Sequence, residues 1–423
     1  MNILFVSAYV PSPIRVRPYG FIRALARRGH NITLVCGAAP GDAEALDELR
    51  RVCVRVAPLR TRRAGMLRNA LRALPGPLPL QAAIDLSPAL LEAVRNEARG
   101  GRYDVAHVEH LRASALDYAL LRLPAVLDSV DCISLLFERA LRGSPSLKSR
   151  ALALLDLART RAYEATYPDR YDRVVVSSPE DAWALAQLNI ERSASNAGPD
   201  ASPFTVHRSS FNPIEVVPNG VDLDYFAPQP VERADATLVF SGKMSYHANE
   251  AAALFLAREI MPLVWRVRPD VRLVIAGSGP TRPVRALAAD ARVEVTGFLP
   301  DLRPAIASAA VAVCPLRYGV GIQNKVLEAM ALATPVVAAR QVARSIAARA
   351  GEDMLFAERP EEYAQAILAL LDNPAEAARM GAAGRRYVER RHSWDAAAAR
   401  LEQIYHEAID SVSPQRQSRL APV

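Results

Sequence analysis

The chain has 423 residues, of which 51% are hydrophobic and 23% are charged, and its formal net charge at pH 7 is +7. This length and apolar content suit two packed domains, and the absence of any run of 18 uncharged apolar residues excludes a membrane-spanning helix at the level of sequence. The four cysteines lack metal-ligand spacing and the first residues lack the features of a signal peptide, so we expect free thiols in a cytoplasmic protein.

The first half of the chain alternates short apolar runs with helical patterns. The expected strands are Ile3–Ser7, Ile32–Cys36, Val105–Val108, Ala125–Leu127 and Val174–Ser177. The helices expected between them include Phe21–Arg28, Pro88–Arg99 and Glu180–Leu188. This alternation predicts an α/β fold with a parallel sheet.

The basic charge is concentrated at the beginning of the chain. Residues 1–75 hold 13 arginines and 4 acidic residues, whereas the remainder holds 39 basic and 41 acidic side chains. The densest part runs from Arg60 to Arg72, where Leu67 and Leu71 recur at helical spacing. A basic amphipathic helix suits an anionic membrane surface. A solvated arginine-rich face is the alternative, and no motif indicates a nucleic-acid partner.

The alternation breaks at residues 192–213, which are rich in Ser, Pro, Asn and Gly and have no periodicity. We expect a loop at a domain boundary there. It would separate an N-terminal domain over residues 1–205 from a C-terminal domain over residues 213–392.

A second alternating series follows this break. Its expected strands are Glu215–Val217, Thr237–Ser241, Arg272–Ala276, Glu294–Thr296, Val311–Pro315, Val336–Ala338 and Met354–Phe356. The longest expected helix is Glu250–Val267, and the chain closes with an amphipathic helix, Trp394–Ile409, for which Ser393 is the N-cap. Open α/β sheets bind ligands beyond the carboxyl ends of their strands.

The strongest candidate ligand site is the glycine-rich stretch 319–330, where a helix begins directly after an apolar strand. Gly319 and Gly321 allow the backbone to approach a ligand closely, and amides at a helix start favour anions. Lys325 adds a cation and Glu328 a carboxylate. These groups suit the phosphates and ribose hydroxyls of a nucleoside diphosphate, although a glycine-rich turn that binds nothing is the alternative.

Further signatures occur in a fixed order along the second half of the chain. They are Val217–Phe226, which contains Pro-Asn-Gly-Val-Asp, Phe240–Asn249, Ile275–Pro280, Thr296–Phe298, the stretch 319–330, Thr334–Val337 and the pair Ser393 and Trp394. As a set they resemble glycosyltransferase family 4, retaining enzymes with the GT-B fold. The resemblance implies two facing Rossmann-like domains, a donor nucleotide held mainly by the second, and a closing helix, here 393–412, that crosses back to the first.

The resemblance also implies which residues bind the donor. These are Gly242, Lys243, Gly277, Gly319, Gly321, Lys325 and Glu328. Glu328 stands where the family places the carboxylate on the ribose hydroxyls, and Lys243 stands where members usually have an Arg that touches the diphosphate. The family's second cation is missing a few residues later, and we infer that Lys325 supplies that charge instead.

One departure from the family concerns its E-x7-E pair. The first glutamate, eight residues before the ribose glutamate, is replaced here by Val320. The family assigns that carboxylate to the sugar end of the donor, so the contacts to the sugar stay open while nucleotide binding remains expected.

The first domain resembles the family in residues 103–110, a strand that ends in a histidine near the reacting sugar. The candidates are His107, Glu109 and His110; we prefer His110 and include Glu109 and Lys243 among the catalytic residues. The alternative is that His107 is packed inside the strand and that His110 only orients the loop.

The acceptor is expected at other residues of the first domain. The first loop lacks the family's Gly-Gly, so Arg15 and Arg17 are expected to contact the acceptor or a phosphate. Asp128 follows a strand and is expected to touch acceptor hydroxyls, with turn capping as the alternative. Asp222 and Asp224 look like a DxD metal motif but lie in the Pro-Asn-Gly-Val-Asp turn, so no metal ligand is assigned.

The resemblance implies a metal-independent enzyme without a cofactor. It would move a sugar from a UDP- or GDP-linked donor to a glycan or lipid-linked acceptor in bacterial envelope or exopolysaccharide synthesis, in the cytoplasm or on the inner face of the plasma membrane. Preorganised donors and the cations Lys243 and Lys325 would stabilise the departing phosphate. Two alternatives stay open: a non-catalytic GT-B protein that binds nucleotide or acts as a scaffold, and a nucleotide-sugar epimerase.

Overall fold

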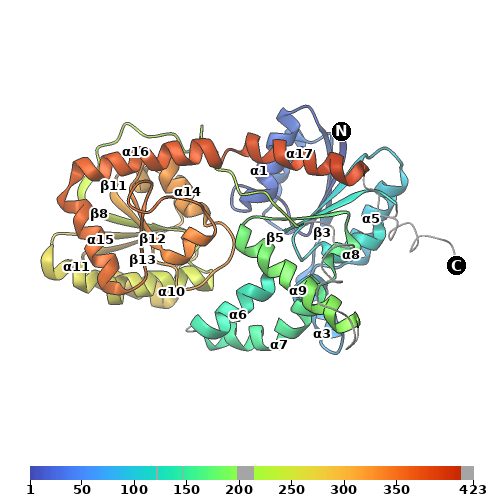
Figure 1. The fold of residues 1–423 in the computed structure, drawn as a ribbon, viewed down its shortest axis with the longest axis horizontal. Helices are drawn as coiled ribbons and strands as arrows, with labels where there is room; N and C mark the ends of the chain where they lie inside the picture. The colour runs from blue at the N-terminus through green and yellow to red at the C-terminus, as the bar shows by residue number, and fades with distance from the viewer. Residues whose placement is uncertain (121, 145, 198–213, 411–423) are drawn as a thin grey trace. The chain divides into compact units, whose positions relative to one another are not determined.

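The computed structural model describes residues 1–120, 122–144, 146–197 and 214–410. They divide into two compact units, each built around its own parallel sheet (Figure 1). Of the described residues, those within 1–137, 154–197, 214–218 and 394–410 form the first unit, and those within 138–153 and 219–393 form the second.

The sheet of the first unit has the strand order β3-β2-β1-β4-β5-β6-β7, with all neighbours parallel. Its strands are β1 (Asn2–Ser7), β2 (Asn31–Ala38), β3 (Arg55–Arg60), β4 (Val105–Glu109), β5 (Ala125–Val130), β6 (Arg173–Val176) and β7 (Ile214–Val216). This is the Rossmann order with one strand added, and its topological switch point lies between β1 and β4.

Ten helices of the described residues accompany this sheet along the chain. They are α1 (Val16–Arg27), α2 (Ala43–Val52), α3 (Arg63–Ala73), α4 (Leu80–Ile84), α5 (Pro88–Arg99), α6 (Ile133–Gly143), α7 (Leu147–Glu164), α8 (Tyr167–Arg170), α9 (Pro179–Ala197) and α17 (Trp394–Asp410). The closing helix α17 packs against α1, where the rings of Phe21 and Trp394 meet edge to face at 5.3 Å. A Cβ on Gly20 would lie 2.3 Å from the Trp394 ring, so this contact requires glycine.

Both faces of the first sheet are buried. Ile3 and Phe5 belong to the core shared with α1 and α17, while Leu4 and Val6 point to the opposite face and are also fully buried. A parallel strand covered on both faces is apolar throughout, and this property made β1 predictable from sequence.

The second unit repeats the same architecture. Its sheet has the order β10-β9-β8-β11-β12-β13, again all parallel, with a switch point between β8 and β11. Its strands are β8 (Ala234–Ser241), β9 (Arg272–Ala276), β10 (Val293–Gly297), β11 (Ala309–Cys314), β12 (Val336–Ala339) and β13 (Leu355–Ala357). Its helices are α10 (His247–Phe255), α11 (Met261–Val267), α12 (Arg282–Arg285), α13 (Arg303–Ala307), α14 (Asn324–Ala331), α15 (Pro360–Asp372) and α16 (Pro374–Arg391).

The expected α/β fold is confirmed, and two local expectations are wrong. The strand near residue 215 does not open the second sheet, because β7 pairs with β6. Residues 192–197 form the end of α9 and not a loop. Arg192 anchors this end of the helix to the Ala165 carbonyl at 2.9 Å and to Asp169. The rest of the expected loop, residues 198–213, lies outside the described residues. In the arginine-rich stretch, Arg60 ends β3 and the basic helix α3 begins at Arg63.

The helix expected over residues 250–267 is present but not uniform. A π-helical stretch, Leu256–Ile260, separates α10 from α11. Pro262 lies in the first turn of α11, where its ring and its missing amide hydrogen disfavour a regular α-helical turn before it.

Candidate functional site

The switch point of the second unit is lined by two glycine loops that follow β8 and β9. Gly242 and Gly277 both have positive φ, 147° and 139°. A Cβ on Gly277 would lie 1.9 Å from the carbonyl oxygen of Gly242, so the two loops touch backbone to backbone. The Met244 amide donates to the Ser278 carbonyl at 2.8 Å and fixes the same approach.

The two lysines expected at the donor site are joined by one buried amide, Asn249 of α10. The ammonium of Lys325 donates to Asn249 Oδ1 at 2.9 Å, and Asn249 Nδ2 donates to the Lys243 carbonyl at 3.0 Å. The Lys243 side chain itself is exposed. Asn249 therefore holds one cation directly and fixes the backbone that carries the other.

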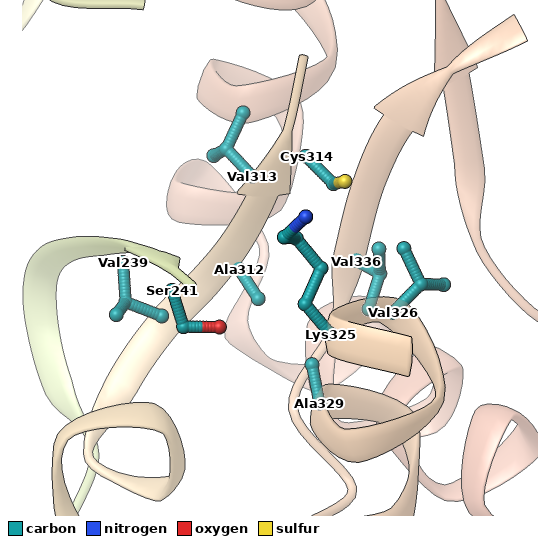
Figure 2. A pocket seen from close by; sticks show the side chains of 9 residues that line it. All are labelled: Val239, Ser241, Ala312, Val313, Cys314, Lys325, Val326, Ala329 and Val336. Atoms are coloured by element: carbon teal, nitrogen blue, oxygen red, sulfur yellow. The ribbon is translucent and has the colours of Figure 1, made fainter. Parts of the chain in front are cut away.

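A small pocket lies beneath these loops between β8, β11 and α14 (Figure 2). Lys325 points into it from the start of α14, toward Cys314 at the end of β11. Its volume of about 10 Å³ has no room for a nucleotide. The pocket is thus the space that Lys325 partly fills under the candidate site.

The glycine-rich loop after β11 is held by side chains that contact Tyr318 and Gly319. Gly321 has a φ of 67°, which favours glycine. The Gly319 carbonyl accepts a hydrogen bond from Arg139 Nη1 at 2.6 Å, and the buried Tyr318 hydroxyl bonds to His247 Nδ1 at 2.7 Å and Ser144 at 3.1 Å. The segment Glu138–Ala153, which interrupts the first unit in sequence, therefore braces the loop of the second.

Glu328 lies one helical turn after Lys325 on α14 and is partly buried. Burial raises the pKa of its carboxyl to about 7, and the nearby Lys325 opposes that rise. Within the described residues no hydrogen bond reaches this carboxylate, so it is an available acceptor for hydroxyl groups.

In the first unit, His110 follows β4 at the switch point. Its φ of 72° is unusual for a residue with a side chain and marks local backbone strain. Nδ1 accepts from the Arg112 amide at 3.2 Å, which assigns the proton of a neutral ring to Nε2. Burial, reinforced by Arg112, lowers the pKa of His110 to about 4, so the imidazole is neutral near pH 7.

Glu109 lies below this loop and is 1% exposed. It accepts hydrogen bonds from the Tyr9 hydroxyl at 2.9 Å and the Ser7 hydroxyl at 3.2 Å. Burial, and then the nearby Asp128, raises its pKa to about 8, so the carboxyl is mostly protonated near pH 7. Its expected catalytic role stays a prediction.

Arg17 and Asp128, expected to meet the acceptor, instead meet each other. Arg17 Nε lies 2.8 Å from Asp128 Oδ2, and the two side chains are 4% and 0% exposed. Arg17 also donates to the Val217 carbonyl at 2.8 Å. Such burial makes the pair an internal brace, and direct contact with an acceptor stays a prediction.

His107 occupies the core, as the alternative sequence interpretation had it. Its ring is fully buried and stacks on Phe5 at 4.2 Å, and its Nδ1 is 2.8 Å from the Tyr405 hydroxyl of α17.

Asp222, part of the sequence that looks like a metal motif, caps its own turn by accepting from the Tyr225 amide at 3.0 Å. Within the described ranges, no group of three His, Cys, Asp or Glu side chains is arranged to hold a metal ion.

The sequence interpretation missed several residues at both switch points: Tyr9, Arg112, Asn249 and Tyr318. Tyr9 and Tyr318 follow strands β1 and β11 closely, a position that could have drawn attention to them. The roles of Asn249 and Arg112 depend on contacts that no local pattern encodes.

Two successive sheets in the Rossmann order, with glycine loops at the switch point of the second, place the chain in the GT-B fold class. Residues 235–373 match the family described as glycosyl transferases group 1. The matched residues all lie in the second unit, which is therefore similar to this family of glycosyltransferases.

Two relatives and two solved structures show the extent of the similarity. The MMP alpha-(1->4)-mannosyltransferase of Mycolicibacterium hassiacum is 31% identical over 47% of this chain and 50% of its own length, so the matched region spans about half of that relative. The phosphatidyl-myo-inositol mannosyltransferase of Mycobacterium leprae is 27% identical over 82% of this chain and 84% of its own length.

The solved structures agree in fold. The sucrose-phosphate synthase of Thermosynechococcus elongatus has a TM-score of 0.68 at 17% identity, covering 97% of this chain and all of that one. The HepE protein of Anabaena in complex with UDP-glucose has a TM-score of 0.64 at 15% identity, covering 96% of this chain and 99% of that one. At these identities the similarity shows the fold alone.

Proposed function

We propose that this protein is a retaining glycosyltransferase that moves a sugar from a nucleotide-sugar donor to a glycan or lipid-linked acceptor. The observation that carries the proposal is the set of groups at the switch point of the second unit. Paired glycine loops, two lysines linked through Asn249 and the unpartnered carboxylate of Glu328 lie on neighbouring elements. Together they match the phosphates and ribose of a nucleoside diphosphate.

On the donor side, negative charge grows on the phosphate as the sugar leaves. Lys243 and Lys325 are the cations proposed to stabilise it, and the amides at the start of α14 add partial positive charge. Because Lys325 is already fixed by Asn249, little reorganisation is needed when the charge develops. No metal ion is needed for this role in the proposal.

The donor base is proposed to be uracil or guanine. HepE is described in complex with UDP-glucose, and a relative from Corynebacterium glutamicum is named as a GDP-mannose-dependent mannosyltransferase.

The acceptor is proposed to bind at the switch point of the first unit, where the neutral His110 presents an Nε2–H donor near the strand ends.

We also propose that the first unit associates with an anionic membrane surface through α3. Residues 49–84 contain no acidic residue, and no α3 side chain is buried. Leu67 and Leu71 are 63% and 58% exposed, and Arg159 of α7 ties the end of α3 to α7 through the Ala73 carbonyl at 3.0 Å. Exposed leucines among arginines suit an anionic lipid interface. Among the described helices, none is long and apolar enough to cross a bilayer.

A donor-hydrolysis assay tests the catalytic proposal without knowledge of the acceptor. UDP- and GDP-sugars are incubated with the protein and with His110→Ala, and the released sugar is followed by NMR. The proposal predicts slow release with one nucleotide class, with the sugar first appearing in the anomeric configuration of the donor. Absence of release from every donor, while nucleotide still binds, would support a non-catalytic protein instead.

Vesicle flotation tests the membrane proposal. Wild type is expected to float with vesicles rich in phosphatidylglycerol and to sediment with pure phosphatidylcholine. The double variant Leu67→Ser, Leu71→Ser should lose flotation, whereas Val267→Ser, at an equally exposed apolar position of the second unit, should retain it. Equal flotation of both variants would contradict the role of α3.

A further inference from the structure

A polar cluster surrounds Tyr9 at the switch point of the first unit. The guanidinium carbon of Arg15 lies 4.4 Å from the centroid of the Tyr9 ring, and that of Arg112 lies 6.0 Å from it. The His110 ring centroid is 6.4 Å away. Tyr9 and Arg15 follow β1 and His110 and Arg112 follow β4, so the cluster joins the two central strands of the sheet.

The charges in this cluster do not cancel. Arg112 is paired with Asp85, whose Oδ2 lies 2.5 Å from the arginine Nε. Arg15 donates from Nη1 to the Val10 carbonyl at 2.9 Å, and no carboxylate pairs with it among the described residues.

The other titratable groups facing the cluster supply no balancing charge. Glu109 stays protonated and His110 neutral near pH 7, as their shifted pKa values show. The Asp128 carboxylate is already taken by Arg17. The cluster therefore keeps an excess of one positive charge.

The side chain of Arg15 is positioned in a way that suits the binding of an oxyanion. A guanidinium lying over an aromatic ring is held in place by the face of the ring. Its N–H edge is then free to form paired hydrogen bonds with phosphate or carboxylate oxygens. The Nη1 contact to Val10 further limits its motion.

We propose that Arg15, Arg112 and Tyr9 form a subsite for an anionic group of the acceptor, a phosphate above all. This inference rests on the proposed function, and it adds that the acceptor carries a negative charge close to the reacting hydroxyl. The donor diphosphate is the other source of phosphate that could meet these arginines. The experiment is designed to separate the two sources.

The test uses the full chain and two small probes of different charge. The protein is first saturated with UDP or GDP, whichever binds, so that phosphate cannot enter the donor site. Binding of sn-glycerol 3-phosphate and of glycerol is then measured by calorimetry at constant ionic strength. The variants are Arg15→Gln, Arg15→Lys and the matched control Arg50→Gln, since Arg50 lies on α2 and forms an exposed pair with Asp47.

We expect wild type to bind glycerol 3-phosphate but not glycerol. Arg15→Gln should weaken this binding about tenfold or more, because a charge-assisted hydrogen bond is lost. Arg15→Lys should retain part of the affinity, Arg50→Gln should behave as wild type, and all three variants should bind the nucleotide normally. The thermal unfolding midpoint of Arg15→Gln without ligand is compared with that of wild type, and equal midpoints show that the variant is folded. If Arg15→Gln is not folded, Arg112→Gln replaces it in the same test.

Two results would overturn the inference. Equal binding of glycerol 3-phosphate by wild type and Arg15→Gln would remove the subsite. If Arg15→Gln loses affinity for the nucleotide but binds glycerol 3-phosphate as wild type does, Arg15 is assigned to the donor diphosphate. If the protein binds no nucleotide at all, the proposed function fails, whereas binding of glycerol 3-phosphate that depends on Arg15 would still support the subsite itself.

Discussion

The ammonium of Lys325 is bound to the side-chain oxygen of Asn249 at 2.9 Å, and the other end of the same amide holds the Lys243 backbone at 3.0 Å. Asn249 is 5% exposed, so water does not readily replace it. The two cations of the proposed donor site therefore share one support. In a chain with only three lysines, at positions 148, 243 and 325, both belong to this arrangement.

Replacing Asn249 with Ala should weaken nucleotide binding about tenfold, because Lys325 loses a charge-assisted hydrogen bond and the Lys243 loop loses its anchor. Asn373→Ala is the matched control, since Asn373 caps α16 by accepting from the Glu376 amide at 3.2 Å and lies on another element. The control should lower stability by about 1 kcal/mol without changing nucleotide affinity. Calorimetric titration with UDP or GDP compares the two variants, and equal affinities would remove Asn249 from the site.

Gly277→Ala should destabilise the second unit strongly. Positive φ alone costs an alanine about 1–2 kcal/mol, and the contact of its Cβ with the Gly242 carbonyl adds roughly 1–3 kcal/mol. Gly297→Ala separates the two effects, because Gly297 has a φ of 69° but open space around its Cβ position. Urea unfolding of both variants tests this, and equal losses of stability would show that the close approach of the two loops is not important.

Donor affinity should depend on pH through Glu328. A carboxylate accepts ribose hydroxyls better than a carboxylic acid does, and the pKa of Glu328 is raised to about 7 by burial. Affinity for the donor sugar nucleotide should therefore rise as pH increases through about 7. Glu328→Gln should bind more weakly at high pH and show no such rise; a parallel pH profile for both proteins would assign the titration to another group.

Glu109 should make the folded state lose stability as pH rises. Its carboxyl has a pKa of about 8 in the folded protein and 4.5 when exposed, so the unfolded chain releases this proton first. Its unfavourable contribution is absent below pH 4.5, grows from there to about 8 and is constant above. The advantage of Glu109→Gln over wild type in free energy of unfolding should grow over that range, and a constant difference would show that Glu109 ionises normally.

The scarcity of lysine allows the donor site to be mapped by chemical labelling. Acetic anhydride should modify the exposed Lys243 and Lys148 readily and Lys325 slowly, because Lys325 is partly buried and hydrogen-bonded. A bound nucleotide should protect Lys243 but leave Lys148 unaffected. Mass spectrometry measures both sites in one sample, and equal modification of Lys243 with and without nucleotide would place the diphosphate elsewhere.

The sheets were predictable because their strands are apolar on both faces, as in β1 with Ile3 and Leu4. The strand β7 was assigned to the wrong sheet because its three residues carry no signal for their partner. Its place is fixed by non-local contacts, among them the ion pair of Glu215 with Arg400 of α17 at 2.8 Å.

The residues of the candidate site likewise fall into a group that could be predicted from the sequence and a group that could not. The glycine loop, Lys325 and Glu328 lie within ten residues of one another, so their pattern could be read along the chain. Asn249 and Arg139 act on residues far away in sequence, Lys325 and Gly319, and no periodicity reports such contacts. Arg17 was expected at the acceptor because it lies near the first loop, and Asp128 because it follows an expected strand, but their mutual ion pair buries both side chains.

The most direct test of the account is calorimetric titration of wild type and Glu328→Gln with UDP, GDP and ADP. Wild type should bind UDP or GDP with micromolar or better affinity and prefer it to ADP, with affinity unchanged by EDTA. Glu328→Gln should bind the same nucleotide about tenfold more weakly. Failure of wild type to bind any of the three, or equal binding by Glu328→Gln, would contradict the donor site proposed at the switch point of the second unit.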